Sequence, residues 1–271
     1  MPTLSDKAQT LQAWLRARGR VAIGFSGGVD SALLLRMALD VLGRDQVLAV
    51  IADSPTLPRR ELDDALRLAQ ALGATVVTVA TRELDDPVFA ANPPDRCYFC
   101  KRHLFAEIQR VARERGFEWV LDGNNADDAG DYRPGRRAAQ ELGILSPLME
   151  AELTKAEIRD LSRRLELPTA DKPAMACLAS RIPCGTPVTR ETLARIERAE
   201  AVLHAAGFEV CRVRHHGDVA RLELAPDALP RLLDPDLRER LARDIQAAGY
   251  RYVALDLLGY RMGSLNPARQ L

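Results

Sequence analysis

The chain has 271 residues, with 38 Lys and Arg balanced by 38 Asp and Glu, so its formal net charge is zero. Proteins that hold long RNA or DNA through phosphates usually have a basic excess, so this balance favours a small-molecule substrate and no nucleic-acid partner. No apolar run approaches the length of a membrane span, and residues 1–20 lack the pattern of a secretion signal. We therefore expect no membrane association and a cytoplasmic location.

Apolar runs alternate with helix-patterned segments in the first half of the chain. Near-continuous Val, Ile and Leu runs separated by helices are typical of a parallel sheet that is covered by helices on both faces. The sequence therefore predicts an α/β fold. The expected strands are 21–25, 47–52, 75–79 and 119–121, and the expected helices between them are 32–39, 58–72 and 101–115.

The turn between the first strand and the first helix carries the strongest functional signal. Such a turn exposes backbone N–H groups and the positive end of the helix dipole, which favours a phosphate or pyrophosphate. Its carboxylate, Asp30, would repel a phosphate unless Mg²⁺ shared with ATP lies between them. A plain turn without a ligand is the alternative. The sequence of the turn is Ser26, Gly27, Gly28, Val29, Asp30 and Ser31.

Polar residues follow two further strands of the predicted sheet. Asp53 and Ser54 come after the second strand, and Asp122, Gly123 and Asn124 come after the fourth. Ligands of parallel sheets bind at the carboxyl ends of the strands. We therefore expect these residues to line one crevice with the 26–31 turn.

The second half of the chain predicts a loop followed by a smaller domain. Residues 166–187 are rich in Pro, Ala, Cys and Gly with little periodicity, which is typical of a functional loop. The remainder predicts a small α+β domain, with a three-stranded sheet and two helices. We expect domains at 1–170 and 189–271, joined by a cysteine-bearing linker at 171–188.

Five cysteines in a chain expected to be cytosolic indicate reactive or metal-binding thiols rather than disulfides. Cys97 and Cys100 precede a predicted helix, whose N-terminus lowers thiol pKa values. Cys177 and Cys184 lie in the loop, whereas Cys211, in a strand, is expected to be a small core residue. The first four thiols can form a zinc site. Three of them can hold an iron–sulfur cluster with one open iron, or Cys177 alone can be reactive.

Two arginines occupy alternate positions of one predicted strand. Arg212 and Arg214 are two residues apart, so they point to the same face. Two guanidinium groups on one face suit a phosphate. The alternative is a pair of solvated arginines on an exposed strand.

Several segments together resemble one family, the LarE-type ATP-dependent sulfur transferases of the PP-loop ATP pyrophosphatase superfamily, whose fold is adenine nucleotide alpha hydrolase-like. Members make the pyridinium bis-thiocarboxylate mononucleotide, which is the organic part of the nickel-pincer nucleotide cofactor of lactate racemase. The resemblance covers essentially the whole chain. Its segments are 24–31 (GFSGGVDS), 97–101 (CYFCK), 176–181 (ACLASR), 185–189 (GTPVT) and 212–215 (RVRH).

The resemblance implies roles for the strand ends and the arginines. Residues 26–31 would hold the ATP pyrophosphate with Mg²⁺ and Asp30 in a catalytic role, and Asp53, Ser54 and Gly123 would lie near the nucleotide. Arg212 and Arg214, with Arg181 as a weaker candidate, would bind the substrate phosphate. The implied reaction adenylates a carboxylate of pyridinium-3,5-biscarboxylic acid mononucleotide and converts it to a thiocarboxylate. A homo-oligomer is also expected, with the small domain contributing to assembly.

The resemblance places the sulfur-supplying cysteine at Cys177. Members with that cysteine alone give up its sulfur and are consumed, whereas members that also carry Cys97 and Cys100 hold a [4Fe-4S] cluster. This chain matches the three-cysteine subtype. Cys184 stands where an aromatic residue is expected, which keeps a zinc site as an alternative. The rival functions are another PP-loop enzyme, such as a tRNA thiolase or an amide-forming synthetase, and a zinc-stabilised nucleotide-binding scaffold.

Overall fold

The computed structural model of the chain describes residues 2–130 and 134–261. Two compact units divide the chain, and each is described separately. The N-terminal unit comprises Met1–Glu83 and Asp95–Met175, and the C-terminal unit comprises Leu84–Pro94 and Ala176–Leu271. The short segment Leu84–Pro94 thus belongs to the C-terminal unit, although the chain returns afterwards to the N-terminal one. The domain limits inferred from the sequence stay predictions.

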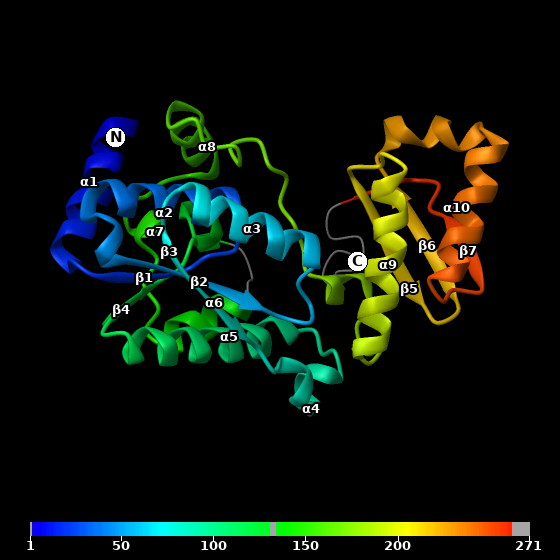
Figure 1. The fold of residues 1–271 in the computed structure, drawn as a ribbon, viewed down its shortest axis with the longest axis horizontal. Helices are drawn as coiled ribbons and strands as arrows, with labels where there is room; N and C mark the ends of the chain where they lie inside the picture. The colour runs from blue at the N-terminus through cyan, green and yellow to red at the C-terminus, as the bar shows by residue number, and fades with distance from the viewer. Residues whose placement is uncertain (1, 131–133, 262–271) are drawn as a thin grey trace. The chain divides into compact units, whose positions relative to one another are not determined.

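A parallel sheet forms the centre of the N-terminal unit (Figure 1), as the sequence predicts. Its order is β3-β2-β1-β4, and each neighbouring pair is parallel. The central strand β1 pairs on both sides, because Val21 lies opposite Val47 on β2 and Trp119 on β4. The strands are β1 (Val21–Gly24), β2 (Val47–Asp53), β3 (Thr75–Ala80) and β4 (Trp119–Leu121).

Helices cover both faces of this sheet, which confirms the predicted fold class. Alternate residues of β1 enter different cores: Val21 and Ile23 pack in one cluster with Leu33, and Ala22 packs in the other with Ile108. This alternation follows from the two-residue period of a strand. The helices of the unit are α1 (Leu4–Arg18), α2 (Val29–Leu42), α3 (Arg59–Ala71), α5 (Arg96–Glu114), α6 (Pro134–Glu141), α7 (Pro147–Glu150) and α8 (Lys155–Arg164).

Two helices of the N-terminal unit begin earlier than the sequence predicts. Helix α2 begins at Val29 with Gly28 as its N-cap, so its first turn contains half of the Ser/Gly turn. Helix α5 begins at Arg96, directly after Pro94 and the N-cap Asp95, rather than at residue 101. A proline is disfavoured inside a helix, but a new helix can begin directly after it. Both cysteines of the 97–100 motif therefore lie inside the helix.

The C-terminal unit contains the predicted three-stranded sheet. Its order is β5-β6-β7, with β5 antiparallel and β7 parallel to β6. Side chains including Leu203, Phe208, Val213 and Leu222 form its own hydrophobic core. The elements are β5 (Cys211–His216), β6 (Val219–Leu224), β7 (Tyr252–Leu255), α9 (Arg190–Ala205), α10 (Pro235–Ala247) and, from the segment 84–94, α4 (Pro87–Ala90).

A search of the described residues for helices that could cross a membrane finds none of sufficient length and apolar character.

Candidate functional site

The turn between β1 and α2 is closed by its own hydroxyl groups. The Ser26 and Ser31 Oγ atoms lie 3.1 Å apart, and Ser31 Oγ also donates to the Gly28 carbonyl at 3.2 Å. Gly27 has a φ of 70°, and a Cβ atom there would come within 2.8 Å of the Ala65 Cβ on α3. Only glycine satisfies both conditions at low cost. The turn therefore has the compact, N–H-rich geometry that a phosphate needs.

The acidic side chain of the turn is neutralised by a distant lysine. Lys155 Nζ donates to Asp30 Oδ2 at 2.5 Å, and Asn125 Nδ2 donates to Asp30 Oδ1 at 3.2 Å. Lys155 is the first residue of α8, after a capping box formed by Thr154 and Glu157. Thr154 and Glu157 have the spacing of a capping box, which indicates a helix start, but nothing in the sequence places this N-terminus beside the turn.

A second lysine reaches the same turn. Lys172 Nζ lies 3.4 Å from the Gly27 carbonyl and 2.7 Å from a carboxylate oxygen of Glu61. Sequence reasoning missed this residue as well, because it lies in the irregular segment after α8. Two ammonium groups therefore lie at this turn, and each is paired with a carboxylate.

The end of β4 meets the turn, as predicted. A Cβ atom on Gly123 would lie 3.1 Å from the Ser31 nitrogen, so glycine permits this close approach. The neighbouring Asp122 is buried, and burial raises the pKa of its carboxyl, opposed by hydrogen bonds from the Ser146 hydroxyl and the Asn124 amide. Of the predicted residues, the structure therefore brings Gly123 together with residues 26–31.

The end of β2 holds a buried polar cluster. Ser54 Oγ lies 2.8 Å from Thr56 Oγ1 and is hydrogen-bonded to Glu83, whose side chain is only 1% exposed. Among the described residues, Glu83 Oε2 has no hydrogen-bond partner. Asp53, by contrast, is about half exposed and pairs with Arg59. Glu83 therefore fixes the Ser54 turn, a role that the sequence did not reveal.

The cysteines of the predicted cluster belong to different units. Cys97 is exposed and Cys100 is half-buried in the first turn of α5, and positions three apart share one helix face. Cys177 lies in the C-terminal unit as the N-cap of the 3-10 helix Leu178–Arg181. Among the described residues, no group of three His, Cys, Asp or Glu side chains is placed to hold a metal.

The two remaining cysteines have local surroundings. Cys184 donates to the Asn92 carbonyl at 3.4 Å, inside the C-terminal unit. Asn92 is fully buried, and its side-chain amide donates to the carbonyls of Pro183 and Thr186 at 2.8 and 2.9 Å. Cys184 is thus part of a loop that Asn92 fixes. Cys211 is fully buried in the C-terminal core, as predicted.

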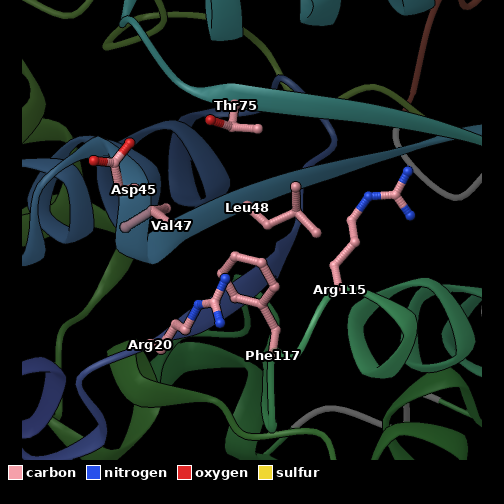
Figure 2. A pocket seen from close by; sticks show the side chains of 7 residues that line it. All are labelled: Arg20, Asp45, Val47, Leu48, Thr75, Arg115 and Phe117. Atoms are coloured by element: carbon pink, nitrogen blue, oxygen red, sulfur yellow. The ribbon is translucent and has the colours of Figure 1, made fainter.

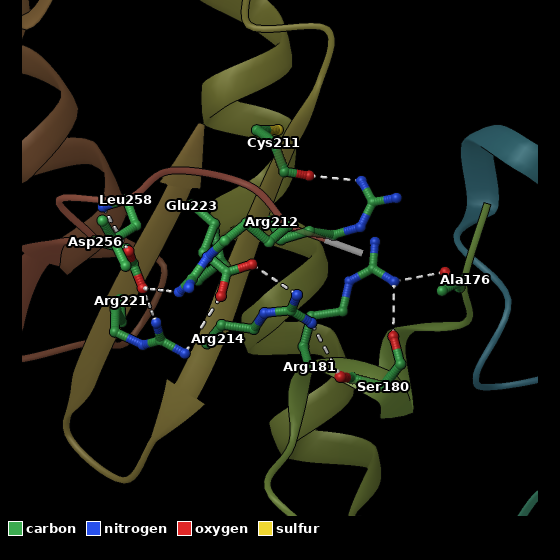
Figure 3. Close-up of polar contacts among 12 residues, drawn as sticks. Ala176, Ser180, Arg181, Cys211, Arg212, Arg214, Arg221, Glu223, Asp256 and Leu258 are labelled. Atoms are coloured by element: carbon green, nitrogen blue, oxygen red, sulfur yellow. Dashed lines mark hydrogen bonds and ion pairs between the residues drawn. The ribbon is translucent and has the colours of Figure 1, made fainter. Parts of the chain in front are cut away.

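Four arginines and three carboxylates form a largely buried polar network in the C-terminal unit (Figure 3). Arg214 pairs with Glu223 at 2.6 Å, and Glu223 also pairs with Arg221 at 3.3 Å. Arg212 and Arg214 are each only 5% exposed, so the alternative of two solvated arginines is wrong. The other members of the network are Arg181, Glu200 and Asp256.

Arg212 contacts a backbone carbonyl and an aromatic ring. It donates to the Cys211 carbonyl at 2.6 Å, and its guanidinium lies 5.0 Å from the Tyr260 ring centroid. Burial, and then the charge of Arg181, lower the pKa of the Arg212 guanidinium. Both effects disfavour the charged form of Arg212, and an anion beside it would oppose them.

A cavity of about 310 Å³ lies at the amino ends of the strands of the parallel sheet (Figure 2). It is lined by Val47 and Thr75, the first residues of β2 and β3, together with Arg20, Arg115 and Phe117 among others. Ligands of parallel sheets bind at the carboxyl ends of the strands. The turn at 26–31 follows the carboxyl end of β1, so this cavity is separate from it.

The parallel sheet, the Ser/Gly turn after its first strand and Gly123 after β4 beside that turn define a PP-loop ATP pyrophosphatase fold. The family model described as NAD synthase matches residues 6–116. The pyridinium-3,5-bisthiocarboxylic acid mononucleotide synthase of Lactiplantibacillus plantarum is 41% identical over 266 residues, covering 98% of this chain and 96% of the relative. The chain therefore belongs to the LarE-type family of ATP-dependent sulfur transferases.

Two further relatives set the extent of this similarity. An uncharacterized protein of Synechocystis sp. is 43% identical over 263 residues, covering 97% of this chain and 98% of the relative. A tRNA-specific 2-thiouridylase of Desulforamulus reducens is 29% identical, but it covers only 57% of this chain and 53% of the relative. Similarity to the thiouridylase thus extends over about half of the chain.

Proposed function

We propose that this protein adenylates a carboxylate of pyridinium-3,5-biscarboxylic acid mononucleotide with ATP and replaces the activated oxygen by sulfur. The observation that carries the proposal is the 41% identity to the synthase, because it spans 98% of this chain and includes both units. The match to the tRNA thiouridylase covers 57% of the chain. The neutral charge balance also favours a small substrate over tRNA.

In the first step, a substrate carboxylate oxygen attacks the α-phosphorus of ATP. A new P–O bond forms, the α–β P–O bond breaks, and pyrophosphate leaves with the bonding electrons. The turn N–H groups, with Lys155 and Lys172 beside them, stabilise the charge that develops on the leaving pyrophosphate. Asp30 is an oxygen donor at the edge of the turn, with 22% of its side chain exposed, so it fits the role of contacting an ATP-bound Mg²⁺ directly or through water.

In the second step, a sulfur nucleophile at Cys177 attacks the acyl carbon of the adenylate. The C–S bond forms, the C–O bond to AMP breaks, and AMP leaves with that electron pair. If Cys177 is the only donor, loss of its Cα proton expels the sulfur from Cβ, which yields the thiocarboxylate and dehydroalanine. The thiol is half-buried, so it is shielded on one side while it remains reachable.

The thiols of Cys97, Cys100 and Cys177 fit the ligand set of a [4Fe-4S] cluster in their chemistry. Cys97 and Cys100 share one face of the first turn of α5, where the helix dipole favours thiolates. Such a cluster, when bound, supplies an open iron that carries sulfide to the reaction.

Arg212 and Arg214 are the proposed contacts for the phosphate of the substrate mononucleotide. Arg214 pairs with Glu223, and the pKa of Arg212 is lowered by burial and by the charge of Arg181. An incoming phosphate offsets this cost, because it replaces cation repulsion by ion pairing.

The test combines activity with metal analysis of protein purified without oxygen. Pyrophosphate release that depends on the pyridinium substrate, and thiocarboxylate product, are expected for the wild type and lost or strongly reduced in Cys177→Ser. About four irons with matching sulfide per chain are expected, with loss in Cys97→Ser and Cys100→Ser. Cys184→Ser is the matched control, because a serine hydroxyl can still donate to the Asn92 carbonyl.

Three results would redirect the proposal. Stoichiometric zinc with no iron would identify a structural metal site and overturn the cluster. Absence of metal, with one product per chain and Cys177 converted to dehydroalanine, would assign the sacrificial route. Pyrophosphate release driven by tRNA and not by the pyridinium substrate would overturn the substrate assignment.

A further inference from the structure

The guanidinium of Arg181 is fully buried, and all three of its nitrogen atoms are engaged. Nε and Nη2 each donate to one carboxylate oxygen of Glu200, both at 2.9 Å. Nη1 donates to the carbonyls of Ala176 at 2.5 Å and Cys177 at 2.9 Å. Figure 3 shows this side chain reaching from the 3-10 helix toward Ala176. Because these nitrogen atoms are already hydrogen-bonded, the Arg181 guanidinium has little capacity to bind a phosphate.

The carbonyl of Cys177 is held by several donors at once. It accepts from the Ser180 amide at 3.0 Å and the Ser180 hydroxyl at 2.7 Å, in addition to Arg181. The Cys177 backbone is thereby fixed at the start of the 3-10 helix, while its thiol stays half-exposed. The arrangement immobilises the residue without covering its reactive atom.

Glu200 connects this turn to the rigid part of the C-terminal unit. It extends from α9, and its Oε1 also accepts the Val213 amide of β5 at 3.0 Å. A buried arginine needs such a partner, because an unpaired charge in the protein interior is costly. Arg181 is therefore anchored to both a helix and a strand, which makes it a stiff support for the turn.

We infer that Arg181, held by Glu200, is a positioning residue that presents the Cys177 thiol to the activated substrate. This inference rests on the proposed function, because it assigns Arg181 to the sulfur step rather than to the substrate phosphate. A displacement of about 1 Å in a reacting group can cost on the order of 10²-fold in rate. The effect of losing the clamp should fall on sulfur transfer and leave adenylation intact.

The test uses two variants. Arg181→Lys keeps the positive charge but loses the paired hydrogen bonds to Glu200, and Glu200→Gln keeps the side-chain shape but removes the negative charge that pairs with Arg181. Single-turnover thiocarboxylate formation should fall about 10²-fold in both, while the KM for the pyridinium substrate and the rate of pyrophosphate release stay near wild type. Hydrogen exchange at residues 176–181 should become faster. Arg198→Lys is the matched control, because Arg198 also lies on α9 but donates to the Ala248 carbonyl at 3.0 Å.

Ser180→Ala covers the case in which the arginine variants do not fold, since it removes one donor to the Cys177 carbonyl without exposing a buried charge. It should slow sulfur transfer less than Arg181→Lys and speed the same amide exchange. A raised KM with unchanged single-turnover rate would overturn the inference and make Arg181 a phosphate ligand. Unchanged exchange at 176–181 would also overturn it. If wild-type protein forms no thiocarboxylate, the proposed function fails, yet the exchange measurement still tests the clamp.

Discussion

Lys155 Nζ lies 2.5 Å from a carboxylate oxygen of Asp30, although the two residues are 125 positions apart in the chain. Asp30 is in the first turn of α2, beside the phosphate-shaped turn, where an unpaired carboxylate would repel ATP. The lysine removes that conflict. Both side chains are partly exposed, at 35% and 22%, so the ammonium can be shared with an incoming phosphate.

Lys155→Gln is expected to slow pyrophosphate release on the order of 10²-fold, because one preorganised donor to developing charge is lost. Stopped-flow detection of pyrophosphate in a single turnover measures this step. Lys7→Gln is the control, since Lys7 pairs with Glu157 of α8 at 2.9 Å and does not touch the turn. A rate within twofold of wild type for Lys155→Gln would contradict the role assigned to this lysine.

Gly27→Ala is expected to abolish tight ATP binding, because it combines a positive φ of 70° with a Cβ only 2.8 Å from that of Ala65. Gly43→Ala is the control, since it adds a Cβ at a positive φ of 80° with nothing within 4 Å, and Gly43 lies at the C-terminal end of α2 rather than in the turn. Adding Ala65→Gly to Gly27→Ala should restore part of the affinity. Isothermal titration with a non-hydrolysable ATP analogue measures it, and equal binding by wild type and Gly27→Ala would contradict the role of this glycine.

Local patterns in the sequence were sufficient to predict the sheets. The apolar runs at 21–25 and 47–52 bury both faces, so their composition alone indicates parallel strands. The geometry of the turn at 26–31 explains the glycines that follow the first run. The three-stranded C-terminal sheet was also predicted, from short strand-patterned segments next to helical ones. The start of α5 was misplaced, because the Cys-Tyr-Phe-Cys segment has no strong helix signal until Asp95 is recognised as its N-cap.

Charged residues that act through distant partners could not be predicted. Lys155 and Lys172 reach the turn only because α8 and the segment after it fold back onto α2 and α3. A strand with Arg212 and Arg214 looks solvent-exposed by composition, yet both are buried because Glu223 lies opposite on β6. Such pairings depend on register between elements, which a single sequence does not reveal.

Glu83→Ala is expected to lower the free energy of unfolding by about 1–3 kcal/mol, because the buried Ser54 hydroxyl loses its carboxylate acceptor and keeps only Thr56 as a side-chain partner. Glu83→Gln keeps an acceptor oxygen and should cost less. Urea unfolding measures the stability of both variants. A KM for ATP that rises as stability falls would show that the hydrogen bonds of Ser54 and Glu83 support nucleotide binding. Equal stability of the wild type and the alanine variant would show that Glu83 does not support this turn.

His215 provides a pH-dependent contribution to the stability of the C-terminal unit. Its Nδ1 lies 3.2 Å from the Tyr250 hydroxyl, and burial, followed by the charges of Arg195 and His216, lowers its pKa below the ordinary value of 6.5. The folded state therefore binds a proton less readily than the unfolded state. The contribution of the neutral His215 side chain to stability is therefore present above pH 6.5 and is lost as the pH falls toward the lowered pKa.

The free energy of unfolding should accordingly fall between pH 7 and pH 5, with a slope of at most about 1.4 kcal/mol per pH unit for each histidine. The pKa of His216 is lowered too, chiefly by burial and by Arg221, so both histidines contribute. His215→Gln should flatten the slope, and His215→Gln combined with His216→Gln should flatten it further. Urea unfolding at half-unit pH steps measures the slope, and a wild-type slope that His215→Gln leaves unchanged would assign the acid sensitivity to other groups.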